Sequence, residues 1–295
     1  MNLPSRIIPI VTFLITSIFS NGQQEPRSSF FWNNYMHTNP AMTGAIYRHH
    51  ANAQWRDQWT KVNGAPTTLW LNYAMKLDSI NSGIGVSYEY DAGGMSRSHT
   101  ALVSYAYHLP IKNMFLSFGA SAGLKTMKIK GSDFIFSSQV PEDPLFFKDR
   151  SLNPVFQCDF GIAMHGENWN TGFSITQLNG AVFRDKYSSY TYKIVPHYWL
   201  FGDYTFQLGE NWKLTPRAQV YTDMKKAAST IALVATVDKD IWFGFSGHLA
   251  SGNISVSPMV GYDIVGKFRI GYIYEYPINS TFGSTHEIIL SYQLK

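Results

Sequence analysis

Apolar and polar residues alternate along most of the chain after residue 46, and this alternation predicts β-strands. Residues 84–90 read IGVSYEY, with Ile, Val and two Tyr on one face and Gly, Ser and Glu on the other. The same pattern recurs in residues 156–162 (FQCDFGI) and 268–276 (FRIGYIYEY). Because successive side chains of a strand point to opposite faces, each segment has one apolar surface and one polar or small surface.

The alternating segments give fourteen predicted strands. They lie at 47–59, 66–77, 82–91, 98–110, 113–126, 153–165, 168–178, 192–207, 210–223, 227–238, 240–250, 252–264, 267–277 and 284–294. Single-chain bacterial membrane barrels have an even number of strands. A count of twelve or sixteen, one hairpin fewer or more, stays open at this point.

The connections between these strands alternate in length. The even-numbered ones are short, around residues 78–81, 111–112, 167, 209, 238–239 and 265–266, and the odd-numbered ones include the long loops 128–152, 179–191 and 277–284. Outer-membrane barrels have short periplasmic turns and longer extracellular loops. The parity therefore places both ends of the predicted barrel in the periplasm.

The two faces of the strands distinguish a membrane barrel from a soluble sandwich. The polar face carries many Gly and Ser residues together with charged side chains, namely Glu89, Asp159, Asp203, Arg217, Asp263, Arg269 and Glu275. The apolar face ends in aromatic residues that suit an interfacial girdle, namely Tyr105, Tyr107, Tyr204, Phe206, Tyr274 and Tyr276. The pattern predicts an all-β fold, a transmembrane antiparallel β-barrel.

Composition supports this prediction. The chain has 18 Tyr, 20 Phe and 8 Trp, and only 15% of it is charged, whereas soluble domains average about a quarter charged residues. The net charge of +4 includes no dense basic run, which argues against nucleic acid as a partner. The single cysteine, Cys158, excludes an internal disulfide framework.

The N-terminus predicts export. Arg6 precedes the apolar run Ile7–Phe19, which has the length of a signal-peptide core and is too short for a membrane helix. Cleavage before Gln23 is expected, and no cysteine follows that would anchor a lipoprotein. The predicted organisation is a signal peptide at 1–22, a periplasmic lead-in at 23–45 and an outer-membrane barrel at 46–295. The last strand alternates to the end of the chain, where Lys295 stands instead of a terminal aromatic residue.

The titratable residues do not form a recognisable catalytic or metal site. His49 and His50 are adjacent, so they would face opposite sides of a strand. His108 and His248 fall on the predicted lumenal face without ligand-like spacing to acids or cysteine. Ser104 and His108 share a face but lie roughly 13 Å apart along a strand, too far to pair. We therefore predict no catalytic residue, no cofactor and no metal site.

The long loop 128–152 is unusually apolar for a solvated connection. It contains four phenylalanines, Phe134, Phe136, Phe146 and Phe147. Clusters of exposed aromatic residues mark contact surfaces, so this loop is the candidate partner-binding loop. The inward charges fit equally an open channel or a lumen filled by neutralised charges, and the sequence does not separate the two.

A set of short motifs carries a resemblance. Near the start lie Asn39-Pro40-Ala41-x-x-Gly44, then Gln54-Trp55-Arg56-x-Gln58-Trp59, then Gly64-Ala65-Pro66-x-Thr68, and Gly283-Ser284-x-His286-Glu287-Ile288 precedes the closing strand. In this order and spacing the motifs resemble the PorP/SprF family, outer-membrane proteins of the type IX secretion system in Bacteroidota. Met42 and Lys295 depart from the family pattern.

The resemblance implies a non-enzymatic role. Such proteins support the secretion or surface anchoring of a partner, often a large gliding-motility adhesin with a C-terminal secretion signal, and some link to periplasmic secretion or gliding components. The implied partners are that secreted protein and outer-membrane lipid. A porin or small-solute transporter is the alternative function.

The residues of the motif also suggest a structural role. Pro66 has no amide donor and suits a strand start after a turn at Gly64. Arg56 is flanked by Gln54 and Gln58 on the inner face. We predict that it pairs with an inward acid on the closing strand, such as Glu287, and helps fix the register where the barrel closes.

Overall fold

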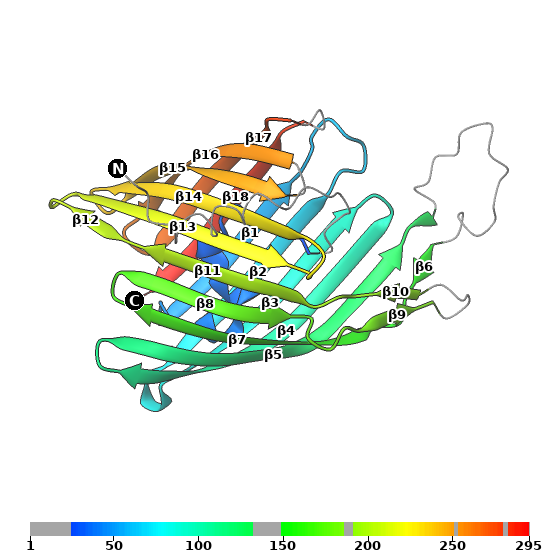
Figure 1. Cartoon of the computed structure of the whole chain (residues 1–295), viewed down its shortest axis with the longest axis horizontal. Coiled ribbons are helices and arrows are strands. Elements are labelled where there is room, and N and C mark those ends of the chain that lie inside the picture. The colour runs from blue at the N-terminus through cyan, green and yellow to red at the C-terminus, as the bar shows by residue number, and fades with distance from the viewer. Residues whose placement is uncertain (1–24, 132–148, 186–190, 251–252, 280–282, 295) are drawn as a thin grey trace, which may run out of the picture.

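The computed structural model describes residues 25–131, 149–185, 191–250, 253–279 and 283–294. Within them the chain forms a closed antiparallel barrel of fourteen wall strands, as predicted (Figure 1). In chain order these are β1 (His49–Asp57), β2 (Thr67–Leu77), β3 (Ser82–Gly93), β4 (Ser96–Ile111), β5 (Met114–Ile129), β7 (Val155–Gly166), β8 (Trp169–Thr176), β11 (His197–Tyr204) with its continuation β12 (Phe206–Leu208), β13 (Trp212–Thr222), β14 (Ala227–Val237), β15 (Ile241–Ala250), β16 (Asn253–Ile264), β17 (Phe268–Pro277) and β18 (Thr285–Leu294).

The barrel closes between its first and last strands. β1 pairs with β18 along its whole length, from His49 opposite Leu294 to Asp57 opposite His286. This pairing removes both sheet edges, which would otherwise expose unpaired backbone groups. The seam therefore joins the first and last wall strands, and Arg56 lies directly opposite Glu287 across it.

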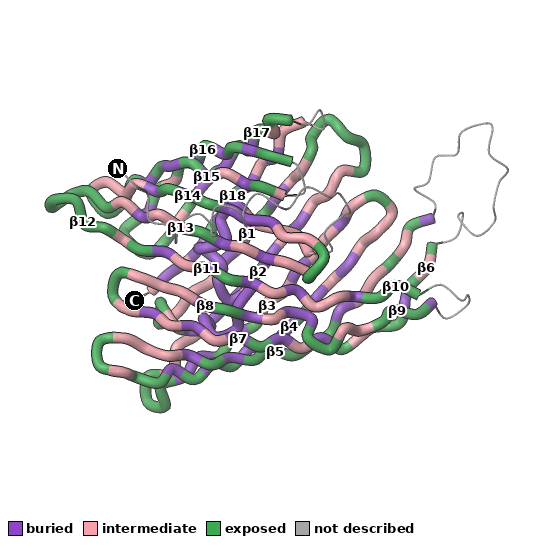
Figure 2. Tube along the Cα trace, viewed as in Figure 1, coloured by how far each residue is buried: buried purple, intermediate pink, exposed green. Residues whose placement is uncertain are grey.

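Side chains alternate between lipid and lumen as predicted. Figure 2 shows exposed and buried positions alternating along the wall strands. On β4 the outward Val103 is 64% exposed, whereas its neighbours Leu102 and Ser104 are buried. None of the described helices is long and apolar enough to cross a membrane.

The short turns gather at one end of the barrel and the long loops at the other. At the short-turn end β2 and β3 are joined by η3 (Asp78–Ile80), and the turn residues Asn81, Asp238 and Val265 have positive φ angles of 48°, 50° and 53°. Such tight connections are typical of periplasmic turns. Three small strands lie at the opposite end, namely β6 (Arg150–Ser151), β9 (Val182–Arg184) and β10 (Thr191–Lys193).

Residues 25–45 lie inside the barrel, and we call them the plug. The prediction of a periplasmic lead-in for residues 23–45 therefore differs from the structure over its described part. The plug contains η1 (Phe31–Asn34), α2 (Tyr35–Thr38) and η2 (Pro40–Met42), drawn in blue within the ring of strands in Figure 1. Its residues from Ser29 to Gly44 are almost all buried. Sequence periodicity missed this placement because a lumenal segment contacts the wall without any strand pattern.

The plug supplies much of the apolar interior. Phe30, Phe31, Trp32, Tyr35 and Met42 are each at most 8% exposed and form one cluster with inward wall residues, namely Ala163, Phe201, Ala232, Val234, Trp242, Met259, Ile273 and Ile289. Burying a large aromatic side chain contributes about 2 kcal/mol. The barrel interior is thus a packed core that the N-terminal segment completes.

Candidate functional site

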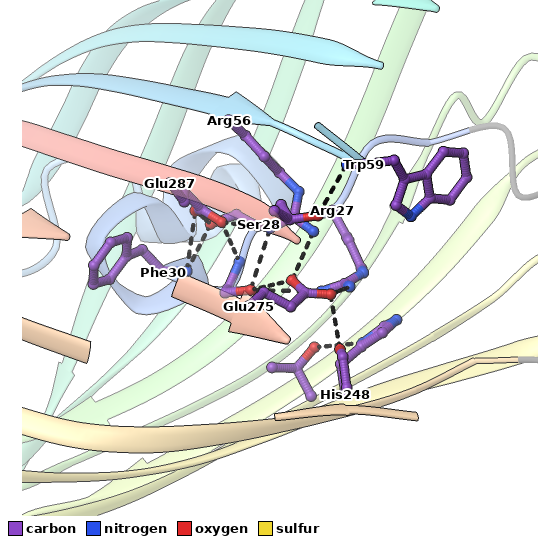
Figure 3. A network of polar contacts seen from close by, with 12 residues as sticks. Arg27, Ser28, Phe30, Arg56, Trp59, His248, Glu275 and Glu287 are labelled. Atoms are coloured by element: carbon purple, nitrogen blue, oxygen red, sulfur yellow. Dashed lines mark hydrogen bonds and ion pairs between the residues drawn. The ribbon is translucent and has the colours of Figure 1, made fainter. Parts of the chain in front are cut away.

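The plug is fastened at its outer end to the barrel seam. Arg56 of β1 donates from Nη1 to Glu287 Oε2 of β18 at 2.7 Å and from Nη2 to Glu275 Oε2 of β17 at 2.8 Å. The predicted ion pair between Arg56 and Glu287 is present. Arg27 of the plug reaches the other oxygen of Glu275. Figure 3 shows these side chains converging in the lumen.

The second carboxylate of this network is bound mainly by plug groups. Glu287 Oε1 accepts from Ser28 Oγ at 2.6 Å, and Glu287 Oε2 accepts from the backbone N–H of Ser29 at 3.0 Å. The N–H of Phe30 and the side chain of Gln54 also donate to Oε1. We call Arg27, Ser28, Ser29, Gln54, Arg56, Glu275 and Glu287 the seam network.

The seam network is balanced in charge and closed to solvent. Two guanidinium groups face two carboxylates, and Arg56 and Glu287 are both 0% exposed. Charges removed from water need opposite charges and hydrogen bonds on most of their donors and acceptors. The plug provides several of them, so the seam and the plug depend on each other.

The Asn39-Pro40-Ala41 motif fastens the middle of the plug to the opposite wall. Asn39 Oδ1 accepts from the N–H of Ala41 at 2.9 Å and so caps η2, with Pro40 at the first helical position. Asn39 Nδ2 donates to the backbone carbonyls of Ile162 and Phe173, each at 3.2 Å. A single amide therefore shapes the plug and ties it to β7 and β8.

Inward-facing glycines give the plug backbone room to approach the wall. A Cβ at Gly119 would lie 2.3 Å from the backbone of Pro40 and Ala41, and one at Gly161 would lie 2.0 Å from Asn39 Oδ1. Gly44 ends the motif with φ +67°, a conformation that L side chains rarely adopt. The wall glycines thus make room for Asn39–Ala41 at β5 and β7, whereas Gly44 lets the plug backbone pass close to Met75 and Gly83 on β2 and β3.

The periplasmic end of the plug is held by a hydrogen-bond chain. His108 Nε2 donates to the carbonyl of Thr43 at 3.0 Å, so its Nδ1 accepts from Ser117 Oγ at 2.7 Å. Ser117 Oγ in turn lies 3.2 Å from His165 Nε2. Ser117 is 0% exposed, so this serine and its two histidines form a buried chain that reaches the plug through His108.

One cluster in the lumen has the composition of a metal site. Ligand atoms of Glu25, His37 and Glu89 lie within 4.8 Å of one another. His37 Nε2, however, is already 3.2 Å from Glu89 Oε2, and the same carboxylate oxygen accepts from Trp70 Nε1 at 2.9 Å. Lys125 Nζ lies 3.5 Å from Glu25 and supplies a cation within the cluster. Burial opposes protonation of His37, but the hydrogen bond and charge of Glu89 outweigh it and raise the pKa of His37.

The remaining motif residues divide between the lipid face and the first outer loop. Trp55 is 45% exposed and points to the lipid. Trp59 and Gly64 lie in the loop after β1 with φ angles of 50° and 73°, and the carbonyl of Pro66 accepts from the N–H of Gln58 at 2.9 Å. This loop is tied across the seam, because the N–H of Thr60 donates to the carbonyl of Ser284. Phe134, Phe136, Phe146 and Phe147 lie outside the described residues.

Sequence reasoning missed Arg27, Ser28 and Ser29 as site residues. The signal available was the concentration of aromatic and uncharged polar residues in 28–39, which is unusual for an exposed tether. Glu275 was identified as an inward acid, but its link to the plug depends on a contact between residues 248 positions apart. The predicted signal peptide at 1–22 lies outside the described residues.

Several solved structures share the fold at low identity. The outer membrane protein Omp33 of Acinetobacter baumannii is 12% identical with a TM-score of 0.51, covering 85% of this chain and 100% of that one. A FadL homologue of Pseudomonas aeruginosa is 10% identical with a TM-score of 0.53, covering 95% and 96%. The toluene transporter TodX of Pseudomonas putida is 10% identical with a TM-score of 0.52, covering 88% and 93%. These likenesses show an outer-membrane barrel fold.

Comparison at the level of sequence families identifies the chain. No curated protein sequence matches it. The family model described as type IX secretion system membrane protein PorP/SprF matches residues 20–292, nearly the whole length. The chain therefore belongs to the PorP/SprF family of type IX secretion system membrane proteins.

Proposed function

We propose that this protein is a non-enzymatic outer-membrane component of the type IX secretion system that supports the secretion or surface anchoring of a partner protein. The partner class is a large secreted adhesin with a C-terminal secretion signal, as in gliding motility. A link to periplasmic secretion components is a second form of the same role. Family membership supports a role in this secretion system. The filled lumen favours a scaffold rather than a diffusion channel.

The filled lumen is the observation that carries this proposal. Among the described residues, cavities between the plug and the wall have volumes of about 20, 30 and 10 Å³. A water molecule needs about 10–15 Å³ by such a measure, so each of these cavities has room for about three waters at most. A barrel whose inward charges bind a plug in the lumen is poorly suited to passing solutes. Its outer surface and loops are then the parts available to a partner.

Affinity purification from outer membranes tests the proposal. The full-length protein, tagged in the native chromosomal locus, is isolated in mild detergent and its partners are identified by mass spectrometry. We expect a secreted protein with a type IX C-terminal signal at near-stoichiometric amount, and loss of that protein from the cell surface when the barrel gene is deleted. Normal surface display in the deletion strain would contradict the proposal.

Conductance measurements test the alternative. The purified barrel is inserted in planar bilayers without a partner. Large, steady single-channel conductance of the wild-type protein would favour a porin or small-solute transporter. We expect the wild-type protein to be nearly silent.

A further inference from the structure

A hollow of about 880 Å³ lies on the lipid-facing side of the wall. Its lining comes from neighbouring strands, in the order β17, β18, β1, β2, β3, β4 and β5. Strands in a sheet are about 4.8 Å apart, so the hollow is roughly 30 Å long across these strands. We call it the wall groove.

Alanines on β1 form the floor of the wall groove beside the seam. Ala51 faces outward between Tyr292 on β18 and Tyr73 on β2, and the next outward residue, Ala53, lies between two leucines in the same way. Tyr73 is 41% exposed and stands above the methyl groups of the alanines. Small side chains between larger ones thus leave a trough along β1.

A second pair of alanines lowers the floor at the other end. Ala101 on β4 faces outward between Tyr88 on β3 and Leu124 on β5. Ala122 on β5 lies beside Val103, which is 64% exposed. Both alanines belong to the same hollow as the trough on β1. The groove therefore continues across β2 and β3.

The side chains that face the wall groove are apolar or aromatic. The outward members of its described lining are alanine, valine, leucine, phenylalanine and tyrosine. Its polar members occupy the alternate strand positions, which face the lumen, namely Asn52, Asn72, Ser87 and Ser291. Apolar cavities do not hold ordered water, and an unfilled space forfeits the contacts of its lining atoms. An apolar chain is the occupant that restores these contacts.

The wall groove begins at the periplasmic end of the barrel. Phe268 is the first residue of β17, and its ring centroid lies 5.2 Å from that of Tyr292 near the end of β18. At the other end of the groove, Leu124 lies ten residues beyond Met114, the first residue of β5. The groove therefore climbs obliquely through the hydrocarbon region. That region is about 30 Å thick and holds two layers of chains, so the groove has the length for a chain of one leaflet.

A polar pair stands beside the lower part of the groove. Tyr73 lines the groove, and its Oη lies 2.9 Å from His49 Nδ1. His49 is the first residue of β1 and so lies at the short-turn end. Rings with polar tips concentrate at the level where acyl chains meet headgroups. The pair thus marks the periplasmic interface at the point where the groove begins.

We propose that the wall groove binds an acyl chain of a phospholipid from the periplasmic leaflet, with the headgroup beside His49 and Tyr73. The groove is continuous with the lipid-facing band of the barrel, so a lipid enters it without leaving the membrane. The bound chain covers β1 from outside, while Arg56 and the plug contact the same strand from inside. Lipid and plug together then hold the strand that closes the barrel.

The proposal is tested with the purified full-length barrel in detergent, by counting bound lipids with native mass spectrometry. The groove variant carries Ala51→Leu and Ala53→Leu, and the matched control carries Ala218→Leu and Ala235→Leu, outward alanines on β13 and β14 that do not line the groove. The probes are palmitoyl-oleoyl phosphatidylethanolamine, dihexanoyl phosphatidylethanolamine with the same headgroup, and lipid A. Heat-modifiable gel mobility shows that each variant is folded.

We expect the wild type and the control variant to bind one long-chain phospholipid and to prefer it to the short-chain one. The groove variant should bind the long-chain lipid about ten-fold more weakly, because the leucines remove roughly ten carbon–carbon contacts with the chain. The comparison of chain lengths on the wild type tests the proposal without any variant.

Three results would overturn the proposal. Equal binding of the long-chain lipid by the groove and control variants would show that the chain lies elsewhere. Equal binding of the two chain lengths would show a headgroup site, and tighter binding of lipid A would assign the groove to the outer leaflet. Conversion of a dimer to a monomer in the groove variant, with phospholipid binding unchanged, would identify a second copy of the chain as the occupant and also contradict the proposal.

Discussion

At the residue scale, Arg56 joins three wall strands and the plug in the seam network. Its guanidinium joins β1 to β17 and β18 through two carboxylates and donates to Ser29 Oγ of the plug at 3.3 Å. All of this occurs out of contact with water. An ion pair in such a place is fragile to the loss of one partner, because the other charge is then left buried.

Arg56→Ala should therefore destabilise the barrel by about 3–5 kcal/mol. The measurement is the temperature at which the folded form is lost in heat-modifiable electrophoresis. Arg48→Ala is the matched control, since the Arg48–Asp78 pair is only slightly longer at 2.9 Å but its side chains are 60% and 47% exposed. Exposed pairs contribute at most about 1 kcal/mol. Equal effects of the two substitutions would refute the structural role of Arg56.

His37 gives the plug a dependence on pH. Its raised pKa means that the folded protein binds the proton more tightly than the unfolded chain. The resulting stability is fully present below the ordinary histidine value of 6.5 and is lost as pH rises through the raised pKa. The difference in free energy of unfolding between the wild type and His37→Gln should thus decrease as the pH rises from acid to alkaline. A constant difference across that range would show that the His37–Glu89 pair carries no such energy.

At the scale of elements, the contact between η2 and the wall is possible because two wall residues are glycines without side chains. Gly119 on β5 and Gly161 on β7 leave space that the plug backbone and Asn39 occupy. A methyl group in that space must push either the plug or the strand. The plug is the element that yields, because it has no ladder of backbone hydrogen bonds to the wall.

Gly119→Ala should displace the plug while the wall strands persist. We expect a loss of about 1–3 kcal/mol, the usual cost of overpacking, together with faster proteolysis within residues 25–45. Gly247→Ala on β15 is the control, because a Cβ there meets nothing within 4 Å. Equal protection of the plug in both variants would contradict the proposed packing.

The elements also show what the sequence could reveal. The number of strands, their order and the side to which each residue points were predictable. Lipid on one side and lumen on the other impose an alternation of apolar and polar side chains on every wall strand, as at Val103 and Ser104. The pairing of Arg56 with Glu287 was predictable because both are inward residues at the seam. The position of Phe30 or Asn39 was not, since their partners lie across the lumen and follow no period. Their contacts depend on three-dimensional closure.

At the scale of the whole molecule, the plug makes the barrel a closed body. It is bound near the outer end at Glu275 and Glu287, in the middle at β7 and β8, and near the periplasmic end at His108. On the function proposed above, a path for solutes opens only when these attachments break.

Conductance should therefore rise only in variants that loosen the plug. We expect the wild type and Gly247→Ala to be nearly silent in planar bilayers, and Gly119→Ala combined with Arg56→Ala to show frequent openings. Single-channel recording measures this directly. Steady conductance of the wild type equal to that of the double variant would show that the plug does not block the lumen.

The position of Glu275 and Glu287 has a consequence for biogenesis. The plug is near the start of the chain, whereas the two carboxylates that fasten it are on β17 and β18, the last strands to be made. A chain truncated before β17 has the plug but lacks these two carboxylates. Arg27 and Arg56 then have no acidic partner in the seam network. We therefore expect such a truncated chain not to retain its plug.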